Sequence, residues 1–199
     1  MEEEFNRLNI ETMNINNEFI PNRGNYRDLI AFRKAECIYD ITYYFVNKYL
    51  SIGDRTADQM LQAARSGKQN IAEGCSDSMG SKEIEIKLIV VARGSLQELL
   101  LDYEDYLRVR SLQLWDFNSE KAVQARNACR AHNDSQYYRN AIKERSDETI
   151  ANIAITLIHQ ADTLLGRYLE AIKQQFLEHG GIKEEMTRAR IDYRKMNNT

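Results

Sequence analysis

The feature that most constrains the fold is the scarcity of residues that interrupt helices. The chain has one proline, Pro21, and nine glycines among its 199 residues. Proline breaks helices and glycine costs about 1 kcal/mol in a helix interior, so both concentrate where a chain turns. A β-sheet protein needs many turns, and this chain has few residues suited to them. The sequence therefore predicts an all-α protein.

Apolar residues that recur every three or four positions divide the chain into helical segments. Residues 1–24 lack this pattern, so we expect a flexible N-terminal leader there. The remaining pattern predicts an antiparallel up-and-down four-helix bundle with a helical C-terminal extension. Its expected parts are the first three long helices (25–111), a connection of short helices (112–145), the last long bundle helix (146–181) and a charged terminal helix (182–199).

Polar residues that accept hydrogen bonds mark the expected helix starts. Asn25 is expected to cap the first long helix, and Ser81 the third. Thr56 and Gln59 have the spacing of a capping box, which predicts the start of the second helix. Later starts are expected at Ser119, at Asp134 and after Ser146.

The second helix carries a face of mostly small residues at steps of three and four: Met60, Ala63, Ala64, Gly67, Ile71 and Gly74. The third helix has its apolar period at Ile84, Leu88, Val91, Ser95, Leu99 and Tyr106, and offers small residues at Ala92 and Gly94. Small contact residues let two helix backbones approach closely and gain dispersion contacts. The sequence therefore predicts a helix-packing seam of Ala63, Ala64, Gly67, Ile71, Gly74, Val91, Gly94 and Ser95.

Two polar residues, Asn70 and Glu73, border this expected seam. A partly buried carboxylate needs a partner, so we expect a polar network that fixes the register of the two helices. The alternative, Glu73 as a catalytic acid or base, would need a second titrating group in a pocket.

The residue patterns typical of enzymes and metal sites are missing from the sequence. None of the three histidines, His132, His159 and His179, has a glutamate three positions before it, as di-iron bundles require. His159 lies in an apolar segment and is expected to be a hydrogen-bonded core residue. Cys129 and His132 are one helical turn apart, but a third partner for a hydrolase is not evident. We therefore expect a non-catalytic protein without a cofactor or metal.

Cysteine usage and the N-terminal residues bear on location. Three widely spaced cysteines without a CxxC pair indicate reduced thiols. The start, MEEEFNRLNI, is acidic and unlike a secretory signal, and no apolar run approaches the roughly 20 residues of a membrane span. We expect a cytoplasmic protein that does not cross a membrane.

Charge and aromatic content bear on partners. The net charge is -3, which gives no general attraction to nucleic acid. Local candidates for nucleic-acid contact are Arg55, Arg65, Lys68, Arg188, Arg190, Arg194 and Lys195. The other interpretation of the basic residues from 188 to 195 is a solvated helix of mixed charge.

The tyrosines indicate a protein interface. Among 11 tyrosines, Tyr43, Tyr44 and Tyr49 cannot all face one core, which favours a protein interface.

Three stretches of the second and third helices are similar, in order and spacing, to one known family. Ser66–Gly74 reads SGKQNIAEG, Ser81–Glu83 reads SKE, and Val91–Leu99 reads VARGSLQEL. These stretches resemble the four-helix-bundle family of 23S rRNA intervening-sequence proteins, and the residues beyond Leu112 look like the C-terminal suffix of one subgroup. The family includes the accessory protein of diversity-generating retroelements, which forms a ring of five bundles and binds nucleic acid and a reverse transcriptase. The resemblance therefore implies a homopentamer.

Together these observations predict a non-catalytic, oligomeric helical scaffold that presents a surface to a protein or nucleic-acid partner. The alternative is a nucleic-acid-binding accessory protein that uses the basic residues of the second and terminal helices.

Overall fold

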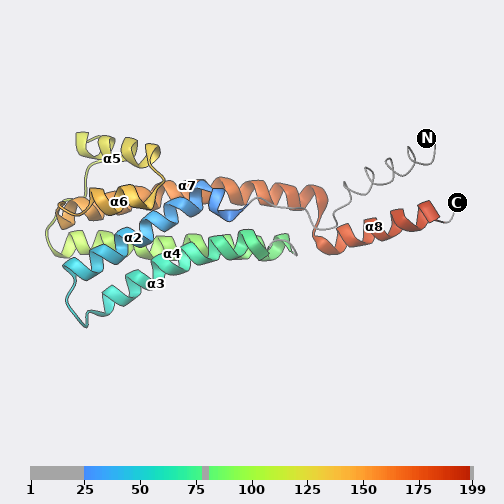
Figure 1. The fold of residues 1–199 in the computed structure, drawn as a ribbon, viewed down its shortest axis with the longest axis horizontal. Helices are drawn as coiled ribbons and strands as arrows, with labels where there is room; N and C mark the ends of the chain where they lie inside the picture. The colour runs from blue at the N-terminus through green and yellow to red at the C-terminus, as the bar shows by residue number, and fades with distance from the viewer. Residues whose placement is uncertain (1–24, 78–80, 198–199) are drawn as a thin grey trace, which may run out of the picture.

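The computed structural model describes residues 25–77 and 81–197, and the expected leader (1–24) lies outside these residues. Within the described ranges, all regular structure is helical (Figure 1). The elements are the 3-10 helix η1 (Tyr26–Asp28) and the α-helices α2 (Ile30–Tyr49), α3 (Arg55–Asp77), α4 (Lys82–Val109), α5 (Glu120–Ala131), α6 (Ser135–Ala141), α7 (Asp147–His179) and α8 (Ile182–Asn197).

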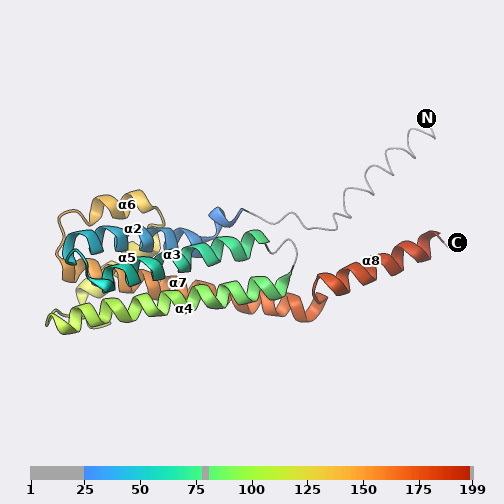
Figure 2. The same ribbon diagram turned by 90° about the horizontal axis from the view of Figure 1, so that it is seen from below.

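Four long helices enclose the core. α2 packs against α3 and α7, and α4 packs against the same two helices, so the four contacts form a closed cycle. Along the chain α2 and α4 run in one direction, and α3 and α7 run in the other (Figures 1 and 2). The space between them is filled by large, fully buried side chains, among them Ile38, Phe45, Met60, Leu96, Leu99 and Tyr103.

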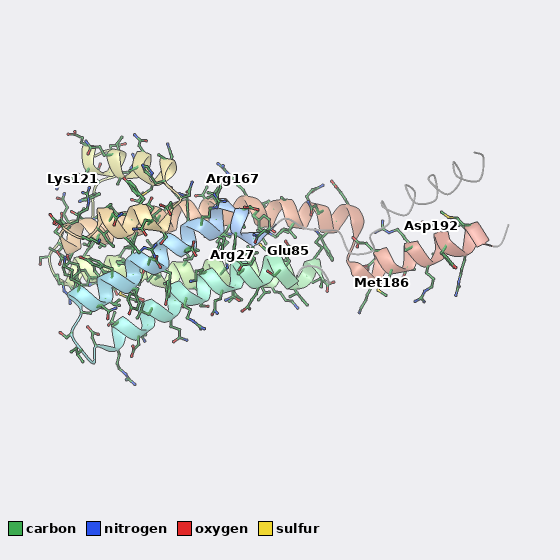
Figure 3. The ribbon with its side chains drawn as sticks, in the orientation of Figure 1. Arg27, Glu85, Lys121, Arg167, Met186 and Asp192 are labelled. Carbon is green, nitrogen blue, oxygen red and sulfur yellow. The ribbon has the colours of Figure 1, made fainter. Side chains whose placement is uncertain are left out.

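The three remaining α-helices lie outside this cycle, and η1 packs against α2 and α3. α6 packs on α2, and α5 packs on α7. α8 extends from the end of α7 away from the packed helices (Figures 1 and 2). Met186 and Asp192 project from this extension in Figure 3, and every side chain from 186 to 196 is exposed.

Several helix starts agree with their expected caps. The Ser81 hydroxyl accepts from the backbone N–H of Ile84 in α4. Asp134 accepts from two N–H groups of α6. Ser119 and Ser146 cap α5 and α7 in the same way. These interactions are local, because a cap acts on N–H groups two or three residues away.

Two expected starts are wrong in detail. Asn25 caps the short η1 instead of the first long helix, which begins at Ile30 after Leu29. The Thr56–Gln59 capping box is replaced by Asp54, whose Oδ1 accepts from the Thr56 N–H at 2.9 Å. Because aspartate is also a strong N-cap residue, it starts α3 earlier than expected.

The apolar face expected for α4 is confirmed at Ser95, Leu99 and Tyr106, which are buried, and is wrong in the first half of the helix. Ile84 and Val91 are 48% and 50% exposed. The residues that α4 buries include Glu85, Ile89, Ala92, Leu96, Leu99 and Tyr103. α4 carries apolar residues on more than one side, and its period alone does not show which side meets α3 and α7.

The expected seam between α3 and α4 forms on the α3 side and differs on the α4 side. Ala63, Ala64, Gly67, Ile71 and Gly74 are all buried. A Cβ atom added to Gly67 would lie 3.0 Å from Cγ and Cδ2 of Leu96, and one added to Gly74 would lie 3.3 Å from Cβ of Leu88. The α3 glycines therefore pack mainly against leucine side chains of α4, and the carbonyl oxygen of Ala92 lies 3.6 Å from the Cβ position of Gly67.

Gly94 and Val91 do not belong to this seam, although Ser95 is buried in it. Gly94 is exposed, and a Cβ atom added there would meet nothing within 4 Å. The rotation of α4 about its axis turns Gly94 and Val91 away from α3.

Candidate association surfaces

An apolar strip lies along the outward side of α4. Val90, Val91 and Leu101 are 51%, 50% and 61% exposed, and the open Gly94 lies between them. Val90, Gly94 and Leu101 are spaced by four and seven residues, so they share one side of the helix. We call these four residues the α4 strip. The exposed Gln97 lies on the same side, between Gly94 and Leu101. The exposed valines and leucine on either side of it make this side of α4 a candidate contact surface.

A second surface is the groove between α2 and α6. The groove has a volume of about 740 Å³ and is lined by Tyr39, Asp40, Tyr43, Tyr44, Asn47, Lys48, Arg139, Ile142 and Lys143. Tyr43 is 57% exposed, while the hydroxyl of Tyr44 donates to the carbonyl oxygen of Lys143 at 2.9 Å. We call it the tyrosine groove. It confirms that these adjacent tyrosines do not all face the core.

The two surfaces lie on opposite sides of the packed helices and differ in charge. In Figure 2, α4 follows one edge of the molecule, and α6 with α2 follows the opposite edge. The exposed carboxylates of Glu98 and Asp105 flank the α4 strip, and that of Asp105 forms an ion pair with Arg108 at 2.6 Å. Lys48 and Lys143 are exposed at the tyrosine groove. The two surfaces are therefore separate and partly complementary in charge.

The polar network expected at Asn70 and Glu73 forms with different members. Nδ2 of Asn70 donates to the carbonyl oxygen of Ser66 at 2.9 Å, and the hydroxyls of Ser66 and Ser95 are 2.9 Å apart. This chain of hydrogen bonds links α3 to α4. Glu73 takes no part in it, because its side chain is exposed.

The buried carboxylate belongs to Glu85, which the sequence reasoning missed. Glu85 is 1% exposed, and the hydroxyl of Tyr168 donates to its Oε1 at 2.6 Å. Burial and this hydrogen bond raise the pKa of the Tyr168 hydroxyl. Glu85 is four residues before Ile89 and seven before Ala92, so the correct phase of α4 would have placed it on the buried side.

The structure places His159 at the surface and Cys129 in the interior. His159 is exposed on α7, so the expectation of a core histidine is wrong. Cys129 is buried, and burial raises the pKa of its thiol, which keeps the sulfur protonated near neutral pH. Within the described ranges, no group of three histidine, cysteine or acidic residues is arranged to hold a metal ion.

The basic residues proposed for nucleic-acid contact are not gathered together. Arg55 begins α3 at one end of the packed helices, while Arg188, Arg190, Arg194 and Lys195 are on α8 beyond the other end (Figure 1). Arg65 is exposed on α3. The ammonium group of Lys68 lies over the ring of Tyr39, 4.2 Å from its centre.

No protein-family model, curated protein or solved structure matches the chain. In the part of the chain that the structure describes, none of the helices combines the length and apolar character required to span a bilayer.

Proposed function

We propose that this protein is a non-catalytic scaffold that assembles with copies of itself and presents a surface to a macromolecular partner. The observation that carries the proposal is the exposed α4 strip on the side opposite the tyrosine groove. Two different surfaces on one chain form a head-to-tail contact, which closes into a ring when the rotation between copies allows it.

The proposed contact places the α4 strip of one copy in the tyrosine groove of the next. The open surface at Gly94 lets an aromatic side chain approach the helix backbone. Tyrosine is among the residues most enriched at protein interfaces. Acidic residues beside the strip would meet lysines beside the groove, which favours this pairing over strip against strip.

The cycle of contacts among α2, α3, α4 and α7 supports our interpretation of the fold as an antiparallel up-and-down four-helix bundle. The resemblance to 23S rRNA intervening-sequence proteins supports the ring and implies five copies. Membership of that family and a cytoplasmic location stay predictions.

The mass of the native particle tests the assembly. We expect a multiple of the 23.2 kDa chain mass by light scattering after size-exclusion chromatography. Leu101→Glu in the strip and Tyr43→Glu in the groove should each reduce the particle toward the single chain. Ile52→Glu is the matched control, because Ile52 is fully exposed in the turn before α3 and belongs to neither surface. A wild-type particle of one chain would contradict the proposal.

Nucleic-acid binding is a second candidate, favoured by the exposed basic residues Arg188, Arg190, Arg194 and Lys195 on α8, which also carries the exposed Lys183. Repetition of α8 around a ring would strengthen a weak contact through multivalency. Filter binding over a salt series tests this role, since phosphate contacts lose affinity steeply as salt rises. Failure to bind structured RNA or duplex DNA at low salt would remove this candidate.

A further inference from the structure

A cavity of about 710 Å³ lies where α5 packs beside α7. α2 contributes Ile30 and Lys34 to its wall, and the connection after α4 contributes Leu114, Trp115 and Phe117. This volume falls within the range of small-molecule sites in proteins. None of the lining residues belongs to the α4 strip or to the tyrosine groove.

The wall of the cavity contains a buried cation. Lys34 is 4% exposed, and its ammonium group donates to the carbonyl oxygen of Cys129 at 2.6 Å. An ammonium group has three donors, and a buried charge is costly unless it is paired. Within the described residues, no carboxylate forms an ion pair with Lys34. Burial lowers the pKa of Lys34, as expected for an ammonium group without a counter-charge.

Three arginines, Arg126, Arg130 and Arg167, line the same cavity, against a single carboxylate, Glu104. Arg130 and Arg167 are exposed, and no hydrogen bond or ion pair involves their guanidinium groups within the described ranges. Figure 3 labels Arg167 on α7. Guanidinium groups match the geometry of phosphate and carboxylate groups. The cavity therefore has an excess of positive charge suited to an anion.

The other part of the wall is aromatic and apolar. Phe117 is 70% exposed, and the guanidinium of Arg126 lies over its ring, 3.9 Å from the centre. Beside it, Nε1 of Trp115 and Oε1 of Gln160 are buried and have no hydrogen-bond partner in the described part of the chain. Most buried polar groups are hydrogen-bonded, so these two groups could donate to or accept from a ligand in the cavity.

We propose that this cavity binds a small organic anion with a planar ring, of the chemical class of the mononucleotides. The anionic group lies near Lys34, Arg130 and Arg167, and the ring lies beside Trp115 and Phe117. The charge of the ligand supplies a counter-charge to Lys34, and the ring covers the exposed aromatic surface. This site is additional to the proposed assembly and does not depend on it.

The only tryptophan of the chain lines the cavity, so its fluorescence reports directly on ligand entry. The full-length protein is titrated with AMP, GMP, CMP and UMP at constant ionic strength, and calorimetry checks the binding. We expect a saturable fluorescence change with at least one mononucleotide. The matching nucleoside and inorganic phosphate should each bind at least about ten-fold more weakly, because each lacks one half of the recognised chemistry.

Variants of the exposed arginines distinguish the site from a general effect of charge. Arg130→Gln and Arg167→Gln should each weaken mononucleotide binding about ten-fold, the effect of one charge-assisted hydrogen bond. Arg65→Gln removes the same charge from α3, outside the cavity, and should leave the affinity unchanged. The proposal is overturned if no mononucleotide binds, if inorganic phosphate binds equally well, or if the double variant Arg130→Gln/Arg167→Gln binds like the wild type.

Discussion

Gly67 and Gly94 are on adjacent helices and have opposite surroundings. Gly67 is buried where Leu96 of α4 lies against the α3 backbone, whereas Gly94 has open space around it. Both glycines carry the same intrinsic helix penalty relative to alanine. The effects of replacing each glycine by alanine on the free energy of unfolding should therefore differ only through the packing of α3 against α4.

Gly67→Ala and Gly94→Ala should change stability in opposite directions. Gly94→Ala should raise the free energy of unfolding by about 0.5–1 kcal/mol, because the new methyl group meets nothing. Gly67→Ala should lower it by about 1 kcal/mol, because the methyl group displaces the fully buried Leu96. Urea denaturation measures both, in the Leu101→Glu background so that association contributes to neither. Equal gains in stability would show that Gly67 is not a close contact.

Buried thiol and hydroxyl groups should make the fold sensitive to alkali. Burial raises the pKa of the Cys37 thiol from 9.0 to about 12, and burial also raises the pKa of the Tyr103 hydroxyl above its ordinary value of 10.0. The unfolded chain loses the thiol proton above pH 9 and the hydroxyl proton above pH 10, while the folded chain keeps both. Stability therefore falls as pH rises, by up to about 1.4 kcal/mol per pH unit for each group. The lowered pKa of Lys34 makes stability rise with pH instead, because the folded chain loses this proton first. This rise ends at the ordinary lysine pKa of 10.5, above which the unfolded chain has lost the proton too.

Denaturation midpoints measured from neutral pH to about pH 11 check this prediction. Tyr103→Phe should make the loss of stability above pH 10 less steep, because one titrating group is removed. Tyr43→Phe is the control, since that side chain is largely exposed. A midpoint that does not change with pH in this range would contradict the burial of these groups.

At the scale of elements, local and distant interactions differ in how well the sequence predicts them. The caps at Ser119, Asp134 and Ser146 were predictable because they act within three residues. The rotation of α4 was not, because it depends on where α3 and α7 pack. The same rotation placed Glu85 inside and left Gly94 outside. The cavity was also missed, since its wall joins residues as distant as Lys34 and Arg167.

The cap of α6 should matter more than a surface ion pair. Asp134 accepts from the N–H groups of Gln136 and Tyr137, and a helix of seven residues has little stability of its own. Asp134→Ala should lower the free energy of unfolding by about 1–2 kcal/mol. Asp105→Ala breaks an exposed ion pair with Arg108 and should cost less than about 0.5 kcal/mol. Thermal denaturation ranks the two variants, and the reverse order would refute the prediction.

At the scale of the whole molecule, the central claim is that the α4 strip and the tyrosine groove are two halves of one contact. The helix α4 and the pair α2 and α6 lie on opposite edges of the packed helices (Figure 2). Each chain can therefore form the contact twice, once with each neighbour. A contact of strip with strip would instead join two chains and leave the groove open.

The most direct test is the native mass of an equimolar mixture of Leu101→Glu and Tyr43→Glu chains. Each variant alone should be a single chain of 23.2 kDa. The mixture should form a pair, because the groove of the first variant and the strip of the second are both intact. A mixture that contains only single chains, or a Tyr43→Glu variant that keeps the wild-type mass by itself, would contradict the account.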